Sequence, residues 1–216
     1  MSDNEGPEPG PNEGIIKFTC SWQRRDCITA DMIAELRPVR RLMRELDLIG
    51  VGEDGIGFGN LSRRLRIPGL GEGGPTGRAT FVITGSQTGS LRDPGPEAYS
   101  YVYDWDIEGN RLGCAGLCRA SSESLTHAVL YGLSEGIVSV LHVHSPRIWA
   151  EWRHAGLSTR EEAAYGTPAM AEEMRRVFVE NGSPASGAIR MSGHRDGIFA
   201  WGPSVDAVRK TVLGLG

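Results

Sequence analysis

The chain of 216 residues is long enough for one domain, with or without a tail, and it can bury a core without disulfide bonds. Its 30 glycines follow no repeating period, which excludes a collagen-like fibre and favours a fold rich in loops. Four of the 27 acidic residues lie within positions 1–14, so the other 23 balance the 23 basic residues of the remaining chain. Such a neutral body lacks the basic surface that nucleic acid or anionic lipid requires, and neither is expected as a partner.

Positions 1–14 are acidic and rich in Gly and Pro, so we predict a disordered tail there and a single domain over residues 15–216. The tail has neither the basic residues nor the apolar run of a signal peptide, and the longest apolar stretch, 137–143, is far too short to span a bilayer. We therefore expect a cytoplasmic location and no membrane partner. The cysteines lack the spacing of a zinc ribbon and are expected to be free thiols. They are Cys20, Cys27, Cys114 and Cys118.

The spacing of apolar residues in the first third of the chain predicts helix followed by strand. Apolar residues recur at steps of three and four over 29–49, which is the spacing of one helical face. Pro38 interrupts the run, so we expect a kink or two abutting helices, the second beginning near Pro38, and a stop at Gly50. A glycine-rich loop follows over 50–60, and alternating apolar and polar residues over 61–67 predict a half-buried strand.

The rest of the chain alternates short strands with helices, which indicates a layered α/β domain. The expected elements are a loop at 69–77, strands at 79–84, 99–107 and 111–114, a helix from Ser121 or Ser122 to about 133, a strand at 137–143, a helix at 167–180, strands at 189–191 and 198–201, and a last helix from 203 or 204. Five large side chains at alternate positions of one strand are expected on the same face. They are Tyr99, Tyr101, Tyr103, Trp105 and Ile107.

Two of the five histidines are placed to act together. His142 and His144 are two residues apart on a predicted strand, so both imidazoles project from the same face, just before Ser145-Pro146 ends the strand. Two convergent imidazoles suit zinc, whose catalytic sites use three protein ligands and leave one position open. A hydrogen-bonded pair of histidines at a strand end is the alternative.

Glu123 follows Ser121 and Ser122 at the predicted start of a helix. The two serines present hydroxyl and backbone N–H groups that could receive an anion, with simple helix capping as the alternative. A carboxylate in the first helical turn is also favoured by the helix dipole alone. His127, one turn further on the same face, is interpreted as a packing or hydrogen-bonding residue, with metal ligation as the alternative. The glycines of 55–60 do not form a dinucleotide fingerprint, because a helix precedes them and a strand follows.

Taken in chain order, six segments resemble the class II aldolase/adducin family of zinc-dependent sugar-phosphate enzymes. The segments are Gly59-Asn60-Leu61-Ser62-Arg63-Arg64, residues 82–89, Ser121-Ser122-Glu123 with His127 and Tyr131, residues 140–146, Tyr165-Gly166-Thr167-Pro168, and Gly193-His194 through Gly202. The resemblance covers about residues 30–212. It implies a three-layer α/β/α fold with a central sheet that is largely antiparallel or mixed.

The resemblance also implies roles for individual residues. His142, His144 and His194 would be the ligands of one zinc ion per subunit, and Glu123 would be the catalytic acid/base. The residues implied in holding a substrate phosphate are Gly59, Asn60, Ser86, Thr88, Gly89, Ser121 and Ser122. Zinc would stabilise the enediolate of a small hydroxy-carbonyl substrate, a sugar phosphate as in the family, while Glu123 moves a proton. The family assembles as cyclic tetramers, so a homotetramer is implied.

Two departures from the family pattern concern the proposed ligands and the phosphate site. Arg195 and Asp196 separate His194 from the glycine that directly follows the histidine in the family, which leaves Asp196 as an alternative ligand. The Thr-Gly turn of the family has two extra residues here, so either Ser86 or Thr88 could meet the phosphate.

A third departure concerns the reaction. The connection over 149–165 is shorter than in the sugar-phosphate aldolases and offers only Tyr165 in place of their catalytic tyrosine. Arg63 or Arg64 could approach an anion, but strand alternation lets only one of them face the site. The combination of Ser121-Ser122-Glu123, His142-x-His144 and His194 still makes a zinc lyase that performs aldol cleavage or addition the leading prediction. The alternatives are a dehydratase or epimerase of the same family and a non-catalytic interaction module that resembles the adducin head domain.

Overall fold

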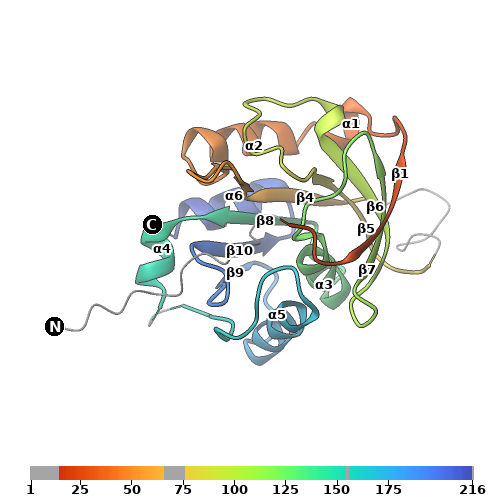
Figure 1. The fold of residues 1–216 in the computed structure, drawn as a ribbon. Coiled ribbons are helices and arrows are strands. Elements are labelled where there is room, and N and C mark those ends of the chain that lie inside the picture. The colour runs from red at the N-terminus through yellow and green to blue at the C-terminus, as the bar shows by residue number, and fades with distance from the viewer. Residues whose placement is uncertain (1–14, 66–75, 154–155, 216) are drawn as a thin grey trace.

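The computed structural model describes residues 15–65, 76–153 and 156–215 (Figure 1). The predicted tail at 1–14 and most of the predicted loop at 69–77 lie outside the described residues. The strands are β1 (Thr19–Arg24), β2 (Gly50–Val51), β3 (Gly57–Phe58), β4 (Asn60–Leu65), β5 (Thr80–Thr84), β6 (Tyr99–Asp106), β7 (Arg111–Gly116), β8 (Ser139–His144), β9 (Gly187–Arg190) and β10 (Gly197–Gly202). The helices are α1 (Ala30–Ile33), α2 (Leu36–Glu45), α3 (Ser124–Leu133), α4 (Pro146–Glu151), α5 (Pro168–Glu180) and α6 (Val205–Leu213), with a 3-10 turn at Pro96–Ala98. None of the helices in these three segments has the length and apolar character needed to cross a membrane.

Eight strands form one mixed sheet in the order β1-β7-β6-β5-β4-β8-β10-β9. β1 runs parallel to β7, and the other neighbouring pairs in this sheet are antiparallel. The predicted sheet, largely antiparallel or mixed, is confirmed. β4 and β8 lie next to each other, and Asn60 at the start of β4 pairs with His142 near the end of β8. This pairing brings the end of the glycine-rich loop beside the His-x-His strand.

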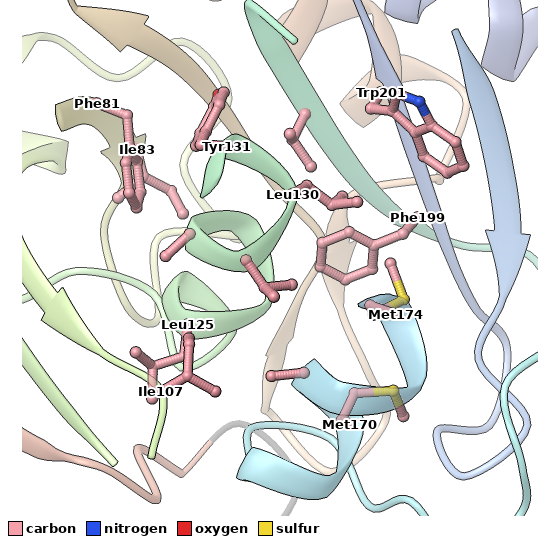
Figure 2. Packing of buried hydrophobic residues seen from close by; sticks show 14 of the residues in the cluster. Phe81, Ile83, Ile107, Leu125, Leu130, Tyr131, Met170, Met174, Phe199 and Trp201 are labelled. Carbon is pink, nitrogen blue, oxygen red and sulfur yellow. The ribbon is translucent and has the colours of Figure 1, made fainter. Parts of the chain in front are cut away.

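Helices cover both faces of the sheet and produce the three layers that the resemblance implied (Figure 1). α3 and α5 pack on one face, where Phe81 and Ile83 of β5 join their core (Figure 2). α1, α2 and α6 pack on the other face, which receives Val82 from the same strand. Successive residues of a central strand thus enter two different cores, as expected for a strand that is covered on both sides.

The strand β6 departs from simple alternation. The register between β6 and β7 shifts just after Val102. Tyr99 and Tyr101 pack with the core under α1, α2 and α6, whereas Trp105 and Ile107 pack with the core under α3 and α5. The prediction that the five alternate side chains share one face is wrong, because a β-bulge adds a residue to one strand and reverses the side from which later residues project.

The predicted first helix is a pair of helices, and the break between them precedes Pro38. α1 ends at Ile33 and α2 begins at Leu36, so Pro38 is the third residue of α2. Proline costs no hydrogen bond there, because the first N–H groups of a helix have no acceptor within the helix. α2 ends at Glu45 and not at Gly50, which begins β2.

The sequence reading predicts neither β1 nor α4. β1 lies at the edge of the sheet, and only Cys20 and Trp22 on one of its faces pack against the core, which is too short an apolar alternation to indicate a strand. α4 begins at Pro146, and Ser145 caps it by accepting a hydrogen bond from the backbone N–H of Ile148 at 3.3 Å. The Ser-Pro pair that ends β8 therefore also begins a helix, with the serine as N-cap and the proline at the first helical position.

β4 is buried on both faces, whereas a half-buried strand was predicted. Its place between β5 and β8 in the middle of the sheet explains the difference. Arg64 is accommodated there because its guanidinium donates to the backbone carbonyls of Tyr131 (2.6 Å), Ser134 (2.9 Å) and Ile137 (2.8 Å). Buried charged side chains are tolerated when they are hydrogen-bonded in this way.

Candidate active site

One cleft gathers residues from widely separated parts of the chain. Its lining includes every residue with a site role predicted from the sequence. These residues are Gly59, Asn60, Ser86, Thr88, Gly89, Ser121, Ser122, Glu123, His142, His144 and His194. Tyr165 also lines the cleft, together with four residues that had no predicted role: Gly57, Phe58, Gly85 and Gln87. Gly57 and Phe58 lie in one of the two glycine-rich turns that hold predicted residues, and Gly85 and Gln87 lie in the other. Their position beside the predicted residues was the signal that could have identified them.

Three imidazoles converge in this cleft. The ligand nitrogens of His142, His144 and His194 all lie within 4.8 Å of one another. His142 and His144 project from β8, and the antiparallel partner β10 brings the preceding turn, with His194, beside them. Gly197 pairs with His144 in this ladder, and a methyl group at Gly197 would come within 3.2 Å of the His142 ring. Glycine at this position therefore leaves room for the three rings.

The imidazole cluster fits a divalent metal ion. His142 Nδ1 donates to the backbone carbonyl of Ile198 at 3.1 Å, which leaves Nε2 of His142 as the nitrogen with a lone pair. This Nε2 lies 3.2 Å from Nε2 of His144. Nitrogen ligands of a tetrahedral zinc ion lie about 3.3 Å apart, since each Zn–N bond is about 2.0–2.1 Å long. Burial lowers the pKa of His142 and of His144 well below the usual value, so both rings are neutral, as a metal requires.

The surroundings of His194 explain how it reaches the cluster despite the two inserted residues. Asp196 has a left-handed backbone, with φ of 63°, and its carbonyl accepts a hydrogen bond from the Ser145 N–H at 2.8 Å. Within the described residues, the three-ligand group contains His194 and not Asp196. The Tyr165 ring packs against the His194 ring, with centroids 4.7 Å apart, and Lys17 Nζ lies 3.6 Å above the Tyr165 ring. The geometry therefore favours His194 over Asp196 as the third ligand.

Glu123 places a buried carboxylate next to the imidazoles. Its side chain is 2% exposed, and Oε1 lies 3.2 Å from His194 Nδ1. Oε2 accepts a hydrogen bond from the Thr126 hydroxyl at 3.0 Å. Burial raises the pKa of Glu123, but its contact with His194 and the Thr126 hydrogen bond lower it more, so the net shift is downward. The group is therefore a carboxylate at neutral pH, able to accept a proton.

The two serines before Glu123 are not the N-cap of α3. The helix begins at Ser124, and Glu123 occupies the cap position without a capping hydrogen bond from its side chain. Ser121 instead forms a turn, in which its Oγ accepts the Glu123 N–H at 3.4 Å and its carbonyl accepts the Ser124 hydroxyl at 2.6 Å. The predicted capping role is therefore wrong, and Ser122 lines the cleft just ahead of the helix.

His127 is a hydrogen-bonding residue behind the cleft, as interpreted from the sequence. It belongs to a buried chain in which His127 Nε2 contacts Asn60 Oδ1 (2.5 Å), Nδ1 contacts Ser62 Oγ (2.7 Å), and Ser62 Oγ contacts the Tyr131 hydroxyl (2.7 Å). Asn60 Oδ1 can only accept, so His127 Nε2 donates to it, and His127 Nδ1 then accepts the Ser62 proton. Tyr131 thus donates to Ser62, Ser62 donates to His127, and His127 donates to Asn60 Oδ1. The Asn60 amide N–H groups remain for the cleft.

The buried His127 predicts a loss of stability in acid. Burial lowers its pKa from 6.5 to about 3. Between those two pH values the unfolded chain binds a proton that the native protein does not, so stability decreases as the pH falls from 6.5, by about 1.4 kcal/mol per pH unit from this residue alone. Denaturant titrations from pH 7 to pH 4.5 should show this slope in the wild type and a shallower slope in His127→Gln. Equal slopes in the two proteins would contradict the assignment.

The turn at 85–89 forms the opposite part of the cleft and is tied to β3. The Gln87 Oε1 accepts the backbone N–H of Gly57 at 3.0 Å. The Thr88 hydroxyl donates to the carbonyl of Gly85 at 2.8 Å, so its proton is already used within the turn. Gly89 packs directly on the backbone of β2, and a Cβ atom there would collide with the carbonyl oxygen of Gly50. A side chain at Gly89 would therefore push the turn out of place.

Neither of the two arginines suggested for an anion faces the cleft. Arg63 pairs with Glu35 at 3.4 Å, and Arg64 is held by the carbonyl groups at the end of α3. The cleft lining described above contains no arginine or lysine. Hydroxyl groups and backbone or side-chain amides are thus the donors that line this cleft.

Comparisons with known proteins agree with this arrangement. The class II aldolase and adducin N-terminal domain matches residues 41–215. A sugar-phosphate aldolase from Thermotoga maritima has 16% sequence identity and a TM-score of 0.64, covering 86% of this chain and 90% of that chain. An L-fuculose-1-phosphate aldolase from Thermus thermophilus has 20% identity and a TM-score of 0.52, with the same coverage of 86% and 90%.

A third similar structure is YgbL from Escherichia coli, which is described with aldolase, epimerase and decarboxylase as alternatives. It has 17% identity and a TM-score of 0.58, covering 86% of this chain and 84% of that chain. At these identities the structural likenesses show a shared fold and not a shared substrate. A comparison with curated protein sequences finds no match.

Proposed function

This chain belongs to the class II aldolase and adducin family, and from that membership we propose that it is a metal-dependent lyase acting on a small hydroxy-carbonyl compound, a phosphorylated sugar. The observation that carries the proposal is a single cleft in which three convergent imidazoles meet a buried carboxylate. Perturbed titratable groups gathered in one cleft are typical of a catalytic centre.

His142, His144 and His194 are the proposed ligands of one divalent ion, and zinc is the proposed metal because all three donors are nitrogens. The bound ion would supply a Lewis acid that stabilises negative charge developing beside the substrate carbonyl. Glu123 would take a proton from the adjacent carbon or oxygen and return it later. Its ionised state and its place 3.2 Å from His194 support this role.

The phosphate is proposed to bind between the two glycine-rich turns and the two serines. The donors for it are backbone N–H groups of Gly59 and Gly89, the Asn60 amide, and the hydroxyl groups of Ser121 and Ser122. We assign the remaining hydroxyl to Ser86 and not to Thr88, because the Thr88 proton is donated to Gly85. Thr88 would then contribute through its backbone.

The Asn60→Asp variant should bind phosphate poorly. The aspartate keeps an oxygen for the His127 N–H but replaces the amide donors in the cleft with a second oxygen and a negative charge. We expect the affinity for inorganic phosphate, measured by calorimetry, to fall at least 100-fold, about 3 kcal/mol, as expected when a hydrogen bond to a charged group becomes a repulsion. The Asn60→Ala variant should lose less. If Asn60→Asp bound phosphate as well as the wild type, Asn60 would not face the anion.

A dehydratase or epimerase of the same family is the second candidate. The observation in its favour is that, among the described residues, Tyr165 is the one tyrosine that lines the cleft, and its ring packs on His194. The zinc-loaded protein should be incubated with a panel of ketose and aldose phosphates, and the products identified by NMR. Two shorter fragments from one sugar would support aldol cleavage, whereas loss of water or inversion without fragments would support the second candidate.

The remaining parts of the proposal are a homotetramer and a cytoplasmic location, both taken from the family resemblance and the sequence. Light scattering of the purified chain tests the first. A non-catalytic, adducin-like module is the third candidate, and it would be supported by protein that contains no metal and whose stability a chelator does not change. The retained carboxylate and imidazoles argue against it.

A further inference from the structure

The lining of the proposed phosphate site contains no positively charged arginine or lysine side chain. A phosphate dianion in a protein is usually held by arginine or lysine as well as by neutral donors. The lining of the cleft supplies only neutral donors on this side. A positive charge does lie behind the lining, on α2, at a residue that the family match over 41–215 does not reach: Arg40.

Arg40 is a buried arginine that binds backbone carbonyls. Its side chain lies in the interior, with the residue 1% exposed. Nη2 donates to the carbonyl of Thr88 at 2.6 Å, and Nη1 donates to the carbonyls of Leu91 at 2.7 Å and Arg92 at 3.4 Å. The guanidinium therefore holds the 85–92 loop, which carries one side of the cleft.

Within the described part of the chain, no carboxylate forms an ion pair with this guanidinium, and Asp93 acts on it only from a distance. Arg40 forms no ion pair there, and the nearby Asp93 is bound instead by Arg37 at 2.9 Å, with Arg41 at 4.0 Å. Burial lowers the pKa of Arg40, but a guanidinium stays protonated at neutral pH. The backbone carbonyls satisfy the N–H groups of Arg40 as they do those of Arg64, and an anion bound in the cleft would add the counter-charge that no ion pair in the described part of the chain supplies.

The geometry of one peptide group links Arg40 to the cleft. The Thr88 carbonyl points at Arg40, and the peptide bonds of the described residues include no cis bond. In a trans peptide the N–H points opposite to the carbonyl, so the N–H of Gly89 points away from Arg40. A methyl group at Gly57, on the cleft side, would lie 3.5 Å from this nitrogen. The peptide dipole is thus aligned with its positive end toward the cleft.

We propose that Arg40 is a positioning residue for anion binding: it orients the Thr88–Gly89 peptide and supplies, through that peptide, the positive charge that the cleft lining lacks. The substrate class it selects is one with a dianionic group, such as a phosphate ester. This inference rests on the proposed function, in which the cleft receives a phosphate.

Calorimetric titration of the full, zinc-loaded chain with inorganic phosphate tests the inference. Arg40→Met keeps the apolar stem and removes the charge, and we expect its affinity for phosphate to fall about tenfold or more while its zinc content stays unchanged. Arg40→Lys, which keeps the charge, should recover part of the affinity. Arg37→Met is the matched control from the exposed face of the same helix and should bind phosphate within about twofold of the wild type.

A second readout separates charge from simple support of the loop. The wild type should bind phosphate more tightly at a pH above the second pKa of phosphate, where the ligand is a dianion, than at a pH below it. Arg40→Met should lose most of this difference in affinity. Circular dichroism shows whether each variant folds, and if Arg40→Met does not, Arg40→Gln replaces it in the same comparison.

The role of Arg40 would be overturned if Arg40→Met bound phosphate as tightly as the wild type, or if Arg40→Lys bound it no better than Arg40→Met. Either result would leave the proposed function intact. A wild-type protein that binds no phosphate would overturn both, and the two failures are therefore distinguishable.

Discussion

Replacement of His142 by alanine is expected to remove stoichiometric zinc from the protein. The Nε2 atoms of His142 and His144 lie 3.2 Å apart, and the variant leaves only two of the three convergent nitrogens. The affinity should fall by more than the roughly 10- to 100-fold typical of losing a hydrogen-bond partner of a ligand, because a ligand itself is lost. Elemental analysis and competition with a chelator measure the change.

His127→Gln is the matched control for this experiment. Both His127 and His142 are buried imidazoles that pack against Phe199, but His127 contacts Asn60 and Ser62 in place of the cluster. The control should lose stability and keep its zinc. In the wild type a chelator should lower the thermal midpoint, and in His142→Ala it should not. Full zinc occupancy in His142→Ala would refute the ligand assignment.

The Glu123→Gln variant should keep its zinc and lose most of its activity. Glutamine has the same shape and retains an oxygen for the Thr126 hydroxyl, so the site should stay assembled. It cannot accept a proton from the substrate, and general acid–base catalysis is worth about 10²- to 10⁴-fold in rate. We expect kcat to fall by that factor on the substrate found with the sugar-phosphate panel, with a much smaller change in the affinity for phosphate.

Glu173→Gln is the control for the carboxylate. Glu173 is also a buried acid, but it pairs with Arg176 at 2.8 Å on α5 and does not line the cleft. Its variant should lose stability without losing kcat. Activity of Glu123→Gln within tenfold of the wild type would show that another group moves the proton.

The parts of the site that the sequence predicts are those encoded over a few residues. His142 and His144 share a face because side chains alternate along a strand, and Glu123 directly follows the two serines that predict a helix start. Their convergence with His194 depends on the register between β8 and β10, which no local pattern specifies. That part of the prediction came from the family resemblance.

The parts that the sequence does not predict depend on contacts between distant segments. Arg40 looks like its neighbours Arg37, Arg41 and Arg44 in the sequence, and only the packing of α2 against the 85–92 loop makes it buried. The bulge in β6 is another example. The amino-acid types along the strand do not reveal it, yet it reverses the side of the sheet from which the later residues project. Arg64 likewise reads as a surface residue until β4 is seen to lie in the centre of the sheet.

The parallel strand β1 has a consequence for how the protein can be divided. The family match starts at residue 41, but β1 covers the edge of β7 through six paired residues, and Arg40 holds the cleft from just outside the match. A fragment that began at residue 41 would leave without partners the N–H and C=O groups of β7 that face β1, and such an open edge promotes aggregation. We therefore expect the stable folding unit to include β1 and to be longer than the region of family similarity, and truncated versions for expression should retain everything from β1 onward.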